Sequence, residues 1–187
     1  MQTTQFLRVR NYFIAAVSVT IWSMLIWQHL HDGVPSHHLF QSADYPAMSN
    51  WWGAIILPVF SWFTLGSIKK RLFQNSDTVE ATRFKQVALS FVIALCYGAA
   101  LSLTFTLGYS EISSVLFPSI LIFAMFFKVY RAEFFLGFLL SMSLTFGAVL
   151  PTMFGTIICL ASFVVYTVMQ FIWRHFKRLF LNKQVTS

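Results

Sequence analysis

Histidine and aspartate residues gather in one short stretch of the chain. Residues 29–38 read HLHDGVPSHH and contain four of the five histidines of the sequence. Neutral imidazole and carboxylate groups are good ligands for Zn²⁺ and Cu²⁺, and three protein ligands with one open position form a catalytic centre. The stretch therefore predicts a metal site at the membrane surface. Its predicted ligands are His29, His31, Asp32, His37 and His38.

Each of these residues has an expected role in the predicted metal site. We expect His31, His37 and His38 to hold a divalent ion, zinc or copper. Asp32 either completes the ligand shell or acts as base toward a metal-bound water, which the ion makes more acidic. His29 is a further ligand or supports one of the others. The spacing matches none of the strong zinc motifs, so the prediction depends on residue type and proximity.

Other interpretations of the histidine stretch stay open. Histidine titrates near pH 6.5, so mild acidification adds up to about four charges and makes the stretch a proton sensor. The same residues suit contact with a polar or anionic lipid head group. Haem held between these histidines and the adjacent Trp51 and Trp52 is a less favoured alternative. Ordinary histidines at the membrane interface are the simplest one.

The composition places the chain in a membrane. Of its 187 residues, 57% are apolar and 10% are charged, whereas soluble domains have about 25% charged residues. Six apolar runs are long enough to cross a bilayer as helices. They cover residues 12–29, 51–68, 86–108, 112–129, 133–150 and 152–173. The predicted fold class is an all-α integral membrane protein, with a six-transmembrane-helix bundle as a single domain over residues 1–187.

The last two apolar runs meet at Pro151. A single helix over residues 133–173 would be about 60 Å long, twice the thickness of the hydrocarbon core. Proline has no N–H group, and its ring clashes with the preceding helical turn. We therefore predict two helices that are separated at Pro151.

The basic residues give the predicted bundle an orientation. All thirteen lysines and arginines fall in four segments on one side of the predicted membrane, and none falls in the connection 30–50. The four segments are 1–11, 69–85, 128–132 and 174–187. Because cytoplasmic loops are enriched in lysine and arginine, we expect both termini in the cytoplasm of a bacterium and the protein in its inner membrane. The net charge of +7 then indicates orientation, and nucleic acid is not an expected partner.

Small residues predict which helices pack together. They recur every four positions in 86–108 and again in 133–150, which lets two backbones approach closely. The first set is Ser90, Ala94, Gly98, Ser102 and Thr106, and the second is Gly137, Ser141 and Thr145. We expect these two helices to be neighbours.

Ionisable residues avoid the middle of every predicted helix, which argues against a proton relay inside the membrane. On the inner side, we expect any contact between Arg131 and Glu133 to be an exposed pair of little energetic weight. On the outer side, Glu111 either completes the histidine site or is solvated.

Together these observations favour one function and leave two alternatives. The favoured one is a metal-dependent site at the outer membrane surface, in a possible enzyme that acts on a lipid or a lipid-linked substrate. The first alternative is a pH-responsive channel or transporter gated by the histidine loop. The second is an accessory or scaffolding subunit, whose small-residue faces contact a second copy or another membrane protein. The sequence lacks the glycine motifs of ATP-driven and nicotinamide-dependent enzymes.

Overall fold

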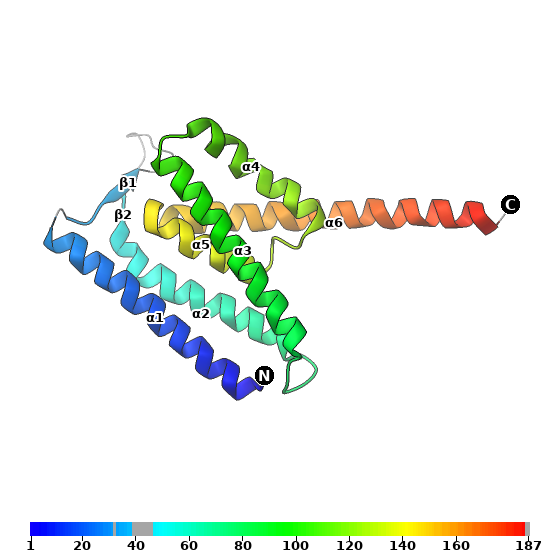
Figure 1. Ribbon diagram of the computed structural model, residues 1–187, viewed down its shortest axis with the longest axis horizontal. Coiled ribbons are helices and arrows are strands. Elements are labelled where there is room, and N and C mark those ends of the chain that lie inside the picture. Colours follow the sequence, from blue (N-terminus) through cyan, green and yellow to red (C-terminus); the bar gives the residue numbers. More distant parts are fainter. Residues whose placement is uncertain (32, 39–46, 186–187) are drawn as a thin grey trace.

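The protein folds into an all-α bundle. The computed structural model describes residues 1–31, 33–38 and 47–185 (Figure 1). Within these residues six α-helices follow one another along the chain. They are α1 (Thr3–Leu30), α2 (Gly53–Leu72), α3 (Ala81–Thr106), α4 (Ser110–Phe126), α5 (Ala132–Phe146) and α6 (Val149–Val185).

Four of these helices are long and apolar enough to cross a membrane, namely α1, α2, α3 and the part of α6 up to Lys177. The helices α4 and α5 are apolar but shorter, with 17 and 15 residues. At 1.5 Å per residue they extend roughly 25 and 22 Å, which is less than a hydrocarbon core of about 30 Å. Each predicted apolar run thus corresponds to one helix, although the run 133–150 continues past the end of α5 at Phe146. Four of the helices have the length of a full span.

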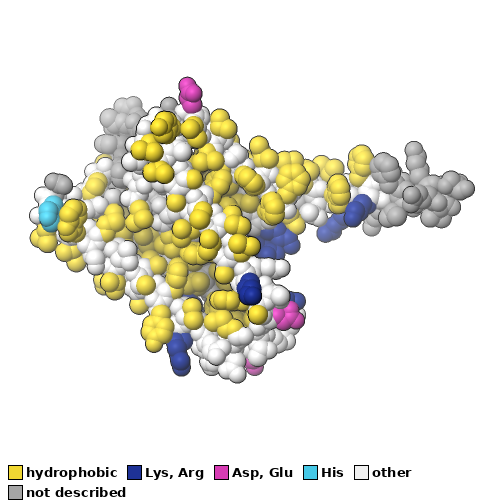
Figure 2. Space-filling model, viewed as in Figure 1, with side chains coloured by type: hydrophobic (Ala, Val, Ile, Leu, Met, Phe, Trp, Pro, Cys, Tyr) yellow, Lys and Arg dark blue, Asp and Glu magenta, His cyan; other side chains and the backbone are white. Residues whose placement is uncertain are grey.

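The outer surface of the bundle is largely apolar, as Figure 2 shows. Large hydrophobic side chains such as Phe63 on α2, Val115 on α4 and Phe171 on α6 are exposed. Soluble monomers rarely expose apolar patches larger than a few hundred Å², whereas a bilayer provides an apolar solvent for them. The surface therefore supports a membrane protein.

Helix α5 forms the centre of the bundle. Nine of its fifteen residues are buried. It packs most extensively against α3, and also against α2 and α6, while α1 covers α2 and α4 covers α6. The core of the protein is therefore built around the shortest helix.

Two glycines allow α3 and α5 to approach closely. A Cβ atom at Gly98 would collide with Oγ of Ser141 and would lie 3.2 Å from the carbonyl oxygen of Phe138. A Cβ atom at Gly137 would collide with the carbonyl oxygen of Phe91. The predicted pairing of these two helices through small residues is confirmed.

The break between the last two helices lies at Gly147 instead of Pro151. Gly147 has φ of 69°, a left-handed conformation that glycine adopts without a steric penalty. A Cβ atom there would also collide with Oδ1 of Asn50. Pro151 falls in the first turn of α6, where backbone N–H groups have no partner within the helix. The chain thus forms two helices as predicted, but a glycine makes the turn, and the proline lies in the first turn of the next helix.

A short hairpin, which no sequence pattern predicted, occupies part of the connection between α1 and α2. Its strands β1 (Ser36–His38) and β2 (Ala47–Ser49) are antiparallel. The backbone N–H of Asn50 donates to the carbonyl oxygen of Pro35 at 3.0 Å, and a 3₁₀ turn, η2 (Asn50–Trp52), then leads into α2. These contacts hold the base of the hairpin against the start of α2.

Candidate functional site

The histidines at the end of α1 each contact a tryptophan ring. The imidazole of His31 stacks on Trp27 with ring centroids 4.3 Å apart, and its Nδ1 lies 2.9 Å from the carbonyl oxygen of Trp27. His29 meets Trp51 edge to face with centroids 5.9 Å apart. The structure therefore places these two predicted ligands against different aromatic partners.

The other predicted ligands come from the hairpin and its approach. His37 and His38 are consecutive residues of β1, where the backbone pairs them with Met48 and Ala47. Asp32 lies outside the described residues. Within the described part of the chain, no group of three or more His, Cys, Asp or Glu residues is placed to hold a metal ion. The metal site, which needs Asp32 and the side chains of β1, stays a prediction.

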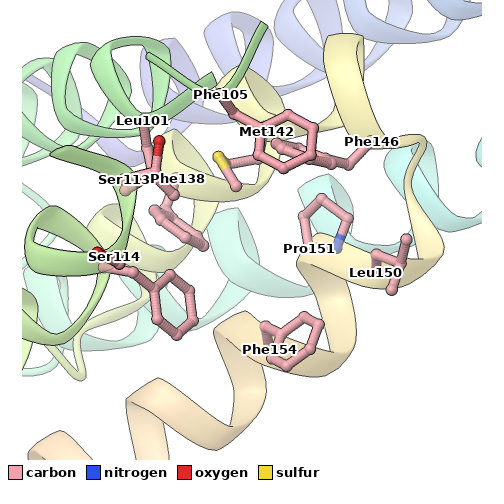
Figure 3. Close-up of a pocket in the computed structure, with 11 residues that line it drawn as sticks. Leu101, Phe105, Ser113, Ser114, Phe138, Met142, Phe146, Leu150, Pro151 and Phe154 are labelled. Atoms are coloured by element: carbon pink, nitrogen blue, oxygen red, sulfur yellow. The ribbon is translucent and has the colours of Figure 1, made fainter. Parts of the chain in front are cut away.

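A cavity of about 410 Å³ lies between α3, α4, α5 and α6 (Figure 3). Helix α5 contributes Phe138, Met142 and Phe146 to its wall, and α6 contributes Leu150 and Phe154. The cavity was not predicted from the sequence, because no pattern along the chain tells which helix surfaces are left apart after packing. Ligand pockets in proteins have volumes of about 300–1,000 Å³, so this cavity has room for a small molecule or part of a larger one.

Two serines of α4 line the same cavity, but their hydroxyl groups are engaged elsewhere. Oγ of Ser113 lies 3.0 Å from Oγ1 of Thr104 and donates to it. Oγ of Ser114 donates to the carbonyl oxygen of Glu111 at 2.8 Å. Both hydroxyl protons are thus donated to acceptors on α3 and α4. The cavity therefore offers a ligand a mainly apolar surface.

The cavity lies at the same end of the bundle as the histidine hairpin. Asn50, at the base of the hairpin, is buried and packs against Gly147 in the turn between α5 and α6. The residues on either side of this turn, Phe146 and Leu150, line the cavity. A change in the position of Asn50 would therefore shift the turn at Gly147, and with it the neighbouring residues that line the cavity.

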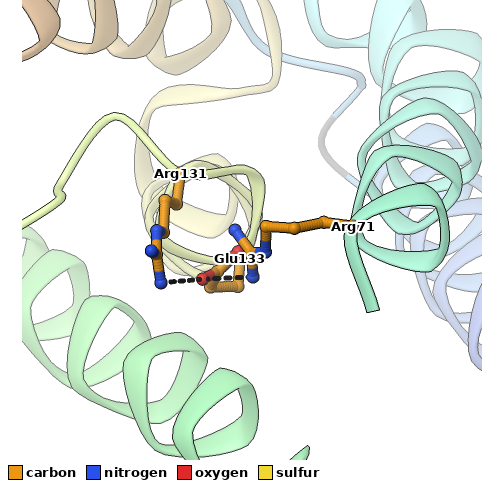
Figure 4. A network of polar contacts seen from close by, with 3 residues as sticks. All are labelled: Arg71, Arg131 and Glu133. Atoms are coloured by element: carbon orange, nitrogen blue, oxygen red, sulfur yellow. Dashed lines mark hydrogen bonds and ion pairs between the residues drawn. The ribbon is translucent and has the colours of Figure 1, made fainter. Parts of the chain in front are cut away.

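An ion pair with a buried carboxylate lies toward the opposite end of the bundle (Figure 4). The side chain of Glu133 is 1% exposed, and its Oε1 accepts a hydrogen bond from Nη2 of Arg71 at 2.8 Å. Nη1 of Arg131 lies 4.0 Å from the same oxygen. Glu133 is in the first turn of α5, where the helix dipole stabilises negative charge.

The ion pair corrects the expectation of an exposed contact between Arg131 and Glu133. The carboxylate is buried, and its closer partner is Arg71 from the end of α2. Breaking a buried pair costs much more than breaking an exposed one, because the remaining charge stays without compensation. Arg71 therefore fixes the end of α2 to the start of α5.

A comparison with protein-family models, curated proteins and solved structures found no match to this chain. We therefore infer function from its residues and their geometry.

The predicted metal site can be tested by elemental analysis of protein purified without a histidine tag. We expect close to stoichiometric zinc or copper in the wild-type protein, and loss of the metal when His31, His37 and His38 are all replaced by alanine. His175→Ala is the matched control, because this fifth histidine lies on α6, far along the chain from the cluster. Wild-type protein without metal, or a triple variant that keeps it, would contradict the ligand assignment.

Proposed function

We propose that this protein binds the apolar chain of a membrane lipid, or of a lipid-linked molecule, in the cavity between α3, α4, α5 and α6. The observation that carries the proposal is a cavity of about 410 Å³ whose wall is mainly apolar. Burial of apolar surface stabilises a complex by roughly 25 cal/mol per Å², and a wall with few polar groups gives a water-soluble ligand little to bind.

The orientation of the bundle is part of the proposal. Both termini lie in the cytoplasm, the hairpin and the cavity lie at the extracytoplasmic end, and the membrane is the inner membrane of a bacterium. Figure 2 supports this orientation, because lysines and arginines are visible toward the start of α1 and along α6, and a histidine is visible at the opposite end. Basic residues are retained preferentially on the cytoplasmic side.

Labelling of single cysteines tests this orientation. In a variant that lacks Cys96 and Cys159, we expect Ser36→Cys to react with an impermeant maleimide in intact cells. Ser76→Cys, in the loop between α2 and α3, should react only after the cells are permeabilised. The reverse pattern, or equal labelling of both positions in intact cells, would contradict the orientation.

The histidine hairpin and the cavity serve the same ligand in this proposal. We expect the head group of the bound lipid at the extracytoplasmic end, where the contact between Asn50 and Gly147 joins the hairpin base to the cavity wall. If the hairpin binds its predicted zinc or copper ion, the ion would act on that head group as a Lewis acid or through a bound water. Without a metal, the protein is a lipid-binding subunit.

Helix packing bears on the alternative of a channel. The stripe of small residues along α3, from Ser90 to Thr106, would favour a channel if it lined an open path. Ala94, Gly98 and Ser102 of this stripe are instead buried, and α5 is the helix that packs against them most extensively. The stripe therefore supports close helix packing, and lipid binding is the better-supported proposal.

The lipid proposal predicts an effect of filling the cavity. Ser114→Phe places a ring in the space that the ligand would occupy, and we expect about tenfold less co-purified lipid, or a larger loss. Forcing a bound chain to share its space with the added ring costs about 1–3 kcal/mol. Each 1.4 kcal/mol or so weakens binding about tenfold. Native mass spectrometry of protein released from a mild detergent measures the retained lipid.

Val115→Phe is the matched control for this experiment. Val115 is the next residue of α4, is exposed on the outside of the bundle and does not line the cavity. The control variant should retain lipid as the wild-type protein does. Equal lipid retention in both variants, with unchanged thermal unfolding, would show that the cavity is not the binding site.

A further inference from the structure

A polar pocket of about 260 Å³ lies at the end of the bundle that carries the basic residues. It is formed by the end of α2, the loop 73–80 and the first turns of α3. Arg71 and Arg83 line it from two different helices, and the loop adds polar groups between them. The loop residues are Gln74, Asn75, Ser76 and Thr78.

The guanidinium group of Arg71 is restrained by the buried carboxylate of Glu133. Its Nη2 donates to the buried Oε1 of Glu133 at 2.8 Å. A guanidinium carries five N–H donors in a fixed plane, and the hydrogen bond to Glu133 uses one of them. Because Glu133 restrains Arg71, which lines the pocket, we expect its remaining donors to be available to a ligand at a low entropic cost.

The loop that closes the pocket has a defined conformation. The N–H of Val79 donates to the carbonyl oxygen of Met1 at 2.9 Å, and the N–H of Thr3 donates to the carbonyl oxygen of Asp77 at 3.0 Å. The side chain of Val79 is buried in a cluster with Phe6 of α1. A ligand therefore meets a wall that is already built, which lowers the entropic cost of binding.

We propose that this pocket binds a phosphate group through Arg71 and Arg83. Guanidinium groups match the oxygen geometry of phosphate, and charge-assisted hydrogen bonds are roughly twice as strong as neutral ones. Glu80 also lines the pocket, and its negative charge disfavours ligands with several phosphates. The pocket is therefore suited to a single phosphate, as a monoester or a diester.

The phosphate can belong to a membrane lipid or to a soluble ester. The last turn of α2 carries Lys69 and Lys70 beside Arg71, and basic residues at a membrane boundary attract anionic lipids. This proposal is independent of the lipid cavity, which lies at the other end of the bundle. Its test must separate a phosphate site from general attraction of anions to a basic surface.

The test compares two ligands and two variants in a detergent without phosphate. Binding of phosphatidic acid and of diacylglycerol with the same chains is measured by native mass spectrometry. We expect the wild-type protein to bind phosphatidic acid with a clear preference. Arg83→Gln should weaken this binding about tenfold, because it removes charge-assisted hydrogen bonds to the phosphate.

Lys85→Gln is the matched control, since it removes one exposed positive charge two positions further along α3 and does not line the pocket. It should leave the affinity for phosphatidic acid unchanged. Equal weakening by both variants, or equal binding of phosphatidic acid and diacylglycerol, would overturn the proposal.

Inorganic phosphate identifies the source of the ligand. If inorganic phosphate displaces phosphatidic acid from the wild-type protein but not from Arg83→Gln, the site is one for soluble phosphate esters. Retained, Arg83-dependent binding of phosphatidic acid in excess inorganic phosphate supports a lipid head-group site.

Discussion

The close approach of α3 and α5 is the constraint on which the rest of the structure depends. Gly98 and Gly137 leave no room for a Cβ atom between the two helices, so the short α5 lies at the centre of the bundle. Apolar side chains gain little from association in a lipid solvent, and close van der Waals packing must hold the helices together. The positions of α2 and α6, which both pack on α5, follow from this contact.

Both proposed sites also follow from the central position of α5. Its C-terminal half presents Phe138, Met142 and Phe146 to the space that α4 and α6 also border, where the apolar cavity lies. Its first turn buries Glu133 against the end of α2 and thereby orients Arg71. A helix too short for a full span thus brings its charged start within reach of the polar loop at one end, and its last turn within reach of the histidine hairpin at the other.

Much of this architecture could be predicted from the sequence, because its causes are local. The apolar runs predict the helices. Small residues that recur every four positions, such as Gly98 and Ser102, predict the pairing of α3 with α5. The partner of Glu133 could not be predicted, since Arg71 is 62 positions away and the pattern near Glu133 favoured Arg131. The cavity could not be predicted either, because it depends on how four helices pack. The turn at Gly147 depends on Asn50, which is distant in the sequence but adjacent in space.

The most direct test of the packing is the effect of one methyl group at Gly137. Gly137→Ala would collide with the backbone of α3, and we expect it to destabilise the protein by about 1–3 kcal/mol. Each kcal/mol lowers the thermal unfolding midpoint by about 2–4 °C in a protein of this size. Gly66→Ala is the control, because Gly66 of α2 has open space around it and alanine favours a helix, so its midpoint should stay equal or rise. A Gly137→Ala midpoint equal to that of Gly66→Ala would contradict the central position of α5.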